Sequence, residues 1–127
     1  MSKLRRHRLG DLQLKIMKVL WDHSSASVPQ VHDALRSEQL AYTTVATMLR
    51  KMEARGLVNH TEENRRFIYR ARVTADAVTQ SMSHDMVDRL FEGSLADMVT
   101  HLLETREVSR EELIRLEQLI AQKKRKL

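Results

Sequence analysis

The spacing of apolar residues changes twice along the chain, and this change limits the possible folds more than any other feature. Up to Gly56, apolar residues recur every three or four positions, which favours amphipathic helices. After Gly56 the segments "LVNHT" and "RFIYRAR" favour two short strands, with "EENR" between them as a hairpin tip. Helical spacing returns after residue 74. The pattern therefore predicts a mainly α (α+β) chain with one β-hairpin in its middle.

Three helices are expected before the hairpin. The segment "LGDLQLKIMKVLW" gives the first, and "SVPQVHDAL" gives the second, with Ser27 and Gln30 as a capping box. In the third, "AYTTVATMLRKMEARGLV", the residues Val45, Leu49 and Met52 share one face. Three helices followed by a hairpin is the order of a winged helix-turn-helix domain, which we expect to span residues 1–73.

The remaining segment, residues 74–127, contains three further amphipathic helical patterns. Two of them carry long apolar faces, formed by Leu95, Met98, Val99, Leu102, Leu103, Leu113, Leu116 and Ile120. Roughly fifty residues in three amphipathic helices are marginally stable as a free-standing domain. We therefore expect a helical dimerisation region, in which these faces pack against a second copy of the chain.

Charge is distributed unevenly between these two parts. Residues 1–74 contain 14 Lys and Arg against 7 Asp and Glu, whereas residues 75–127 contain 8 against 10. A basic front part favours a polyanionic partner such as nucleic acid. The alternative, a solvated surface with an accidental asymmetry, stays open on charge alone.

The third helix carries an unusual number of threonines for a helix. Thr44, Thr47 and Lys51 share a face opposite the apolar one. The recognition helix of a helix-turn-helix enters the major groove, where a Thr hydroxyl can bond base edges and its methyl can contact thymine. Thr43 has two open interpretations, either as a helix cap or as a phosphate ligand.

Basic residues near this helix are the other DNA-binding candidates. Arg50 and Lys51 could contact phosphate or guanine, although exposed cations are common on any helix. Arg65 and Arg66 lie at the expected hairpin tip, from which a wing can reach the flanking DNA. The segment "KLRRHR", residues 3–8, is either a minor-groove arm or a disordered tail.

Enzymatic and membrane functions find little support in the residues. The chain has no cysteine, no phosphate-binding glycine loop and only scattered histidines, so we expect no metal, no cofactor and no catalytic activity. No apolar run is long enough to cross a membrane and no signal peptide precedes the first helix, so we expect a cytoplasmic protein without membrane insertion.

Several segments together resemble the BlaI/MecI penicillinase-repressor family, over about residues 9–121. The most specific are the I-M-x-x-L-W pattern in "LQLKIMKVLW" and the T-T-V-x-T-x-L pattern in "AYTTVATMLRKMEARGLV". The resemblance implies a homodimeric winged-helix repressor of transcription that binds a palindromic operator in double-stranded DNA. It also implies recognition-helix contacts for Thr44, Thr47 and Lys51, and a wing contact for Arg65.

The resemblance extends less clearly to the signal that releases DNA. Members that control β-lactam resistance are inactivated through a membrane sensor protease, by cleavage at an Asn-Phe bond, and the matching pair in this chain is His101–Leu102. Copper-responsive relatives use C-terminal Cys-x-Cys pairs, which this chain lacks. A different class of function, a winged-helix module that binds an acidic protein without sequence-specific DNA binding, stays open as the alternative.

Overall fold

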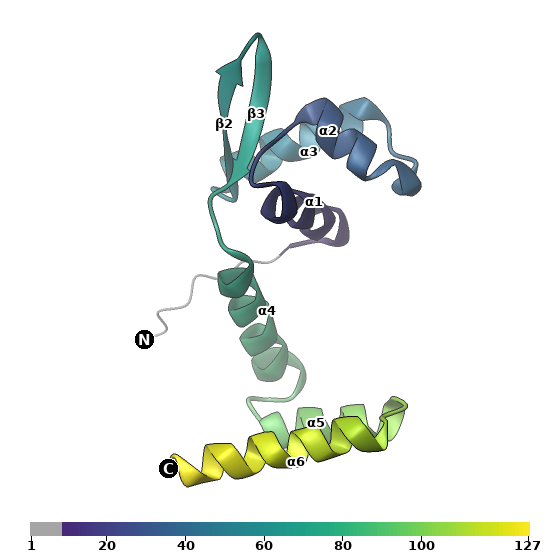
Figure 1. Cartoon of the computed structure of the whole chain (residues 1–127), viewed down its shortest axis with the longest axis vertical. Helices are drawn as coiled ribbons and strands as arrows, with labels where there is room; N and C mark the ends of the chain where they lie inside the picture. The colour runs from purple at the N-terminus through teal and green to yellow at the C-terminus, as the bar shows by residue number, and fades with distance from the viewer. Residues whose placement is uncertain (1–8) are drawn as a thin grey trace. The chain divides into compact units, whose positions relative to one another are not determined.

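The computed structural model describes residues 9–127, so the expected basic arm at residues 3–8 lies outside the described part. The chain forms two compact units, the first ending at Asp85 and the second spanning Met86–Leu127. Figure 1 shows the elements in chain order from purple to yellow. Each unit is described by itself.

The first unit combines helices with a small antiparallel sheet (Figure 1). Its elements are α1 (Asp11–His23), β1 (Ala26–Ser27), α2 (Val28–Ala34), the 3₁₀ turn η1 (Arg36–Glu38), α3 (Tyr42–Ala54), β2 (Val58–Glu63), β3 (Arg66–Ala71) and the first part of α4 (Ala75–Leu90). Three helices followed by the β2–β3 hairpin confirm the predicted winged helix-turn-helix order. The hairpin is the wing, and α3 is the expected recognition helix.

Local sequence signals set the helix ends in this unit. Ser27 Oγ accepts a hydrogen bond from the Gln30 backbone N–H at 3.3 Å, and Gln30 Oε1 accepts one from the Ser27 N–H at 2.8 Å. Thr74 Oγ1 accepts from the Ala77 N–H at 3.0 Å, at the start of α4. Gly56 follows α3 with a φ of +79°, a left-handed conformation that glycine adopts without steric cost. These predicted caps are confirmed.

Within residues 9–127, the sheet has three strands in the order β1-β3-β2, one more than the sequence pattern predicts. The additional strand, β1, is only two residues long, and it pairs with β3 through Ala26–Tyr69 and Ser27–Ile68. Two residues cannot show the alternation that identifies a strand in a sequence. Strand β1 therefore depends on its partner β3, which is distant along the chain.

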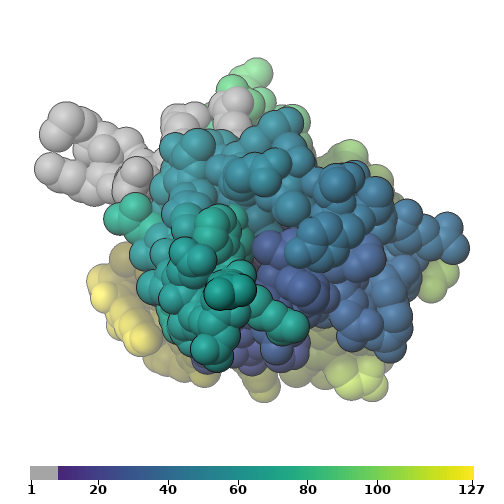
Figure 2. Space-filling view, turned by 90° about the horizontal axis from the view of Figure 1, so that it is seen from above, coloured from purple at the N-terminus to yellow at the C-terminus, as the bar shows by residue number. Residues whose placement is uncertain are grey.

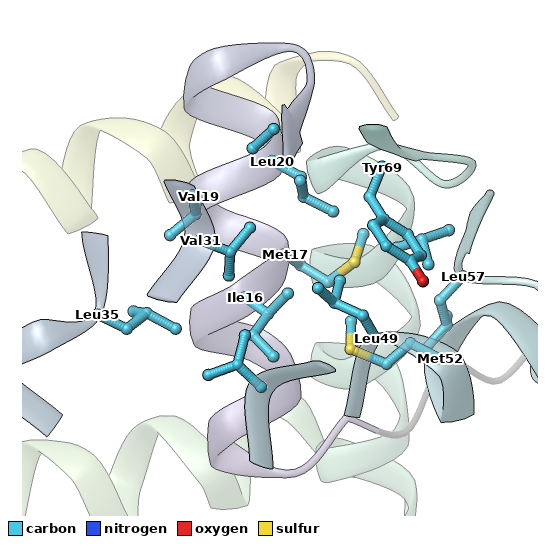
Figure 3. Close-up of a cluster of buried hydrophobic side chains, with 13 residues drawn as sticks. Ile16, Met17, Val19, Leu20, Val31, Leu35, Leu49, Met52, Leu57 and Tyr69 are labelled. Carbon is cyan, nitrogen blue, oxygen red and sulfur yellow. The ribbon is translucent and has the colours of Figure 1, made fainter. Parts of the chain in front are cut away.

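The core of the first unit lies between α1, α2, α3 and the sheet (Figure 3). Its buried side chains are Ile16, Met17, Val19, Leu20, Ala26, Val31, Leu35, Val45, Leu49, Met52, Leu57, Val58 and Tyr69. The three residues predicted to face inward from α3, Val45, Leu49 and Met52, are all fully buried. The helical spacing of apolar residues therefore orients α3 as expected.

The first part of α4 belongs to this same unit. Val78 and Ser81 are buried, and just before the helix the Trp21 indole N–H donates to the Val73 carbonyl at 2.9 Å. The two compact units consequently divide inside α4, between Asp85 and Met86. The domain bounds predicted from the sequence, residues 1–73 and 74–127, stay a prediction.

The second unit contains the end of α4 together with α5 (Leu95–Thr105) and α6 (Arg110–Arg125). Ser94 caps α5 by accepting from the Asp97 N–H at 3.0 Å, and Ser109 caps α6 by accepting from the Glu112 N–H at 3.1 Å. Neither α5 nor α6 has a buried residue. Throughout residues 9–127, no helix is both long enough and apolar enough to cross a lipid bilayer.

The burial of α3 predicts a large effect of truncating its inward face. Leu49→Ala is expected to lower the free energy of unfolding by about 2–5 kcal/mol, because it leaves a cavity at a fully buried position. Denaturant titration followed by circular dichroism measures this change. Lys18→Ala, at an exposed position on α1, is the control and should change stability by less than about 0.5 kcal/mol. Equal effects of the two substitutions would contradict the described core.

Candidate nucleic-acid interface

Helix α3 has one buried face and one polar face. Thr43, Thr44, Arg50 and Lys51 are exposed, and Thr47 is half-buried. These are five of the seven predicted DNA-binding residues, and α3 brings them together opposite its buried side chains. Arg50 Nη2 donates to Thr47 Oγ1 at 3.3 Å, so two of the five candidates also contact each other.

The start of α3 bears on the two interpretations of Thr43. The N-cap position is occupied by Ala41, and no side chain caps the helix. Thr43 follows inside the first turn, with its side chain exposed. Capping therefore does not explain this threonine, and the first turn of α3 presents a hydroxyl next to backbone N–H groups.

The turn between α2 and α3 holds the recognition helix in place. His32 Nε2 hydrogen bonds to the Leu40 carbonyl at 2.8 Å, and the His32 ring meets the Tyr42 ring edge-on at 5.7 Å. Between the helices, Gln39 adopts a left-handed φ of +56°. A side chain of α2 thus fixes the loop from which α3 begins.

The wing ends in a tight two-residue turn. Asn64 and Arg65 have φ angles of +51° and +64°, and the flanking residues Glu63 and Arg66 are paired in the β2–β3 ladder. Positive φ at both central positions is the requirement of a type I′ hairpin, in which glycine is preferred at the second position. An arginine at this position is less stable in the left-handed conformation than a glycine would be. It places a guanidinium group at the tip of the wing.

Of the three arginines on the wing, one is paired with a carboxylate of the described residues and two are not. Arg70 donates to Thr61 Oγ1 at 2.8 Å and forms an ion pair with Glu63 at 3.3 Å. Within residues 9–127, Arg65 and Arg66 form no ion pair with a carboxylate, and both are exposed. The tip of the wing therefore offers two exposed guanidinium groups, with the exposed carboxylate of Glu62 nearby in β2.

A groove of about 440 Å³ separates the wing from α2 and α3. It is lined by Val28, Pro29, Tyr42, Ala46, Arg50, Arg65, Arg66, Phe67 and Tyr69. Figure 2 shows the hairpin, in teal, beside the blue surface of α2 and α3. Three of the seven predicted DNA-binding residues thus line one concave surface that joins the recognition helix to the wing.

Tyr42 and Phe67 were not predicted as site residues. They are 47% and 43% exposed, although both are large and aromatic. In the sequence, Phe67 and Tyr69 fall on the same face of the expected strand, which favours a core position for both. Of the two, only Tyr69 is buried. Burial raises the pKa of the Tyr69 hydroxyl; the charge of Glu53 raises this pKa further, and the charge of Arg50 lowers it. The sequence signal could not show that β3 extends beyond the core.

The other predicted residues lie elsewhere. The eight predicted dimerisation residues belong to the second unit, and none of them is buried. His101 and Leu102 lie inside α5, with the His101 ring 5.9 Å from the Phe91 ring.

In the described part of the chain, no group of three or more His, Cys, Asp or Glu side chains could hold a metal ion.

The three helices and the β2–β3 hairpin define a protein of the winged helix-turn-helix class. The family model described as "Penicillinase repressor" matches residues 9–122, which is most of the chain. The chain belongs to this family and is accordingly a DNA-binding transcriptional repressor and not an enzyme. The resemblance found in the sequence is therefore confirmed.

The names of two relatives agree with this assignment. The "Penicillinase repressor" of Bacillus licheniformis is 31% identical over 118 residues, covering 92% of each chain. The "Methicillin resistance regulatory protein MecI" of Staphylococcus aureus is 16% identical over 118 residues, covering 92% of this chain and 96% of its own.

Solved structures show the same fold. The solution structure of the DNA-binding domain of the repressor BlaI has a TM-score of 0.52 and 29% identity, and it covers 58% of this chain and 92% of its own. A crystal structure of a mutant form of MarR from E. coli has a TM-score of 0.52 at 14% identity, over 90% of this chain and 76% of its own. At this identity, the second comparison supports the fold alone.

The turn at the wing tip predicts that stability and DNA binding can be separated. Arg65→Gly places the residue preferred at positive φ in the turn, so the free energy of unfolding should not fall. The same change removes a guanidinium from the wing and should weaken binding to DNA. Chemical denaturation and fluorescence anisotropy with labelled duplex measure the two quantities. A variant that loses stability but keeps wild-type affinity would refute this role of Arg65.

Proposed function

We propose that the chain is a homodimeric repressor that binds a palindromic operator through α3 and the wing. The observation that carries this proposal is the division of α3 into two faces. Val45, Leu49 and Met52 attach the helix to the core, which leaves the threonines and two cations free to meet DNA. The groove beside α3 adds the two wing arginines to the same surface.

The residue types on this surface suit the parts of a duplex that they would meet. Thr44, Thr47 and Lys51 are proposed to contact base edges in the major groove, since hydroxyl and ammonium groups bond bases there. Thr43 and Arg50 are proposed to bind the phosphate backbone near the first turns of α3. Arg65 and Arg66 are proposed to reach the flanking minor groove or backbone, because they lie exposed at the wing tip.

Two copies are proposed to associate through the second unit. Large apolar side chains remain exposed there, with Leu95 at 61%, Leu103 at 42%, Leu113 at 40% and Ile120 at 57%. A unit without a buried residue in α5 and α6 gains little from the hydrophobic effect until another surface covers it. A second copy of the same faces would cover them, and a two-fold dimer favours a palindromic operator.

We further propose that the repressor acts in the cytoplasm and that a sensor-protease pathway releases it from DNA. Its support is membership of the penicillinase-repressor family. The corresponding pair, His101–Leu102, lies inside helix α5, so cleavage there would require α5 to open locally. A relay partner would act on the second unit and leave α3 and the wing intact.

Sequence-specific binding can be tested on Thr47. Labelled duplexes carrying a palindrome from the promoter of the regulated gene, and scrambled versions, are titrated with wild-type chain and Thr47→Ala at several salt concentrations. Because a base contact discriminates by about 1–3 kcal/mol, Thr47→Ala should lower the ratio of specific to non-specific affinity by about that amount. Equal affinity of the wild-type chain for the palindromic and scrambled duplexes would contradict sequence-specific binding and favour the alternative, a winged-helix module that binds an acidic protein.

Dimerisation can be tested separately by sedimentation. Leu102→Asp puts a carboxylate on the apolar face of α5, so the dimer should dissociate and operator binding should weaken. Thr100→Asp adds the same charge to α5 at an exposed position away from that face, and it should remain dimeric. A wild-type sedimentation mass of one chain would refute the proposed dimer.

A further inference from the structure

The outer part of the wing has little support from the rest of the first unit. Strand β1 pairs with β3 only as far as Ser27–Ile68, so the hairpin beyond Ile68 consists of two strands. Every residue from Thr61 to Phe67 is exposed. A two-stranded ribbon is marginally stable by itself, and its direction is easily changed. Some contact near its base must therefore set where Arg65 and Arg66 lie relative to α3.

His60 makes that contact with Glu53 and Phe67, and its ring also lies 5.4 Å from the ring of the buried Tyr69. Its Nδ1 atom hydrogen bonds to the Glu53 carboxylate near the end of α3, at 2.7 Å to Oε1 and 2.9 Å to Oε2. Its ring stacks on the Phe67 ring, with centroids 4.2 Å apart and planes inclined by 23°. Phe67 is the first residue of β3 on the tip side of the β1 pairing. A single side chain of β2 thus joins α3 to the part of β3 that extends beyond its pairing with β1.

We infer that His60 is a positioning residue for DNA binding, which holds the wing arginines at a fixed place relative to α3. This inference rests on the proposed function of α3 and the wing. The groove between them is lined by Arg50 from α3 and by Arg65, Arg66 and Phe67 from the wing. The hydrogen bond between Glu53 and His60 connects α3, which forms one wall of this groove, to the wing, which forms the other. This connection therefore sets the distance between Arg50 and the wing arginines when both contact one duplex.

The residue types at this position fit such a role. An imidazole offers a flat face for stacking and an in-plane nitrogen for a hydrogen bond, so one ring can meet both partners. Glu53 is an acidic residue on a helix that should approach phosphates, and its carboxylate is directed to His60. The side chains of His60 and Glu53 are 30% and 32% exposed, so both are partly shielded from water.

The experiment measures DNA affinity against salt concentration for the full chain. The probe is a duplex carrying the palindrome that the wild-type chain selects from a random pool. Each phosphate contact contributes about 0.9 to the slope of log affinity against log salt. His60→Ala is expected to reduce this slope as much as the Arg65→Ala/Arg66→Ala variant does, although it removes no arginine. His84→Ala, at an exposed position on α4, is the matched control and should keep the wild-type slope.

Combining the substitutions gives the decisive comparison. If His60 acts through the wing, adding His60→Ala to the Arg65→Ala/Arg66→Ala variant should cause little further loss of affinity. A loss that adds in full, or an unchanged salt slope in His60→Ala, would overturn the inference. The proposed function fails separately, if the wild-type chain selects no palindrome.

Glu53 provides a second variant that tests the same tie from α3. Glu53→Gln keeps an oxygen acceptor for the His60 Nδ1–H group and should retain the wild-type salt slope, whereas Glu53→Ala should lower the slope as His60→Ala does. Thermal unfolding of each variant shows whether the chain still folds. Equal slopes for Glu53→Ala and the wild-type chain would overturn the inference even if His60→Ala failed to fold.

Discussion

The burial of one face of α3 is the constraint on which the rest of the first unit depends. Val45, Leu49 and Met52 are fully buried against a core that α1, α2 and the sheet also supply. Tertiary packing of this kind stabilises a helix far more than intrinsic propensity does. The opposite face can therefore carry three threonines, which are poor helix formers, without loss of the helix. Packing on one side leaves the other side free to carry the side chains that we propose contact DNA.

The wing follows a similar division of roles. Near its base, Tyr69 is buried and serves the fold, and Arg70 reaches along the hairpin to pair with Glu63 next to the turn. At its tip, Arg65 occupies a positive φ that glycine would adopt more easily. A residue kept at a conformational cost in an exposed turn suits a role in binding better than a role in stability.

Much of this arrangement could be predicted from the sequence, because it depends on local signals. The Ser27–Gln30 capping box, the end of α3 at Gly56 and the buried face of α3 each follow from residues close together in the chain. Strand β1 and the groove residues Tyr42 and Phe67 could not be predicted in this way. They depend on pairing and packing between distant segments. The extension of the first unit into α4 likewise depends on burial of Val78 and Ser81.

We propose that the polar face of α3 and the tip of the wing contact DNA together. Titrating the isotope-labelled full chain with a palindromic duplex, and following each backbone amide by NMR, tests it most directly. We expect the largest shifts to cluster in residues 43–51 of α3 and 64–67 of the wing. Shifts confined to α5 and α6, with α3 and the wing unchanged, would contradict it.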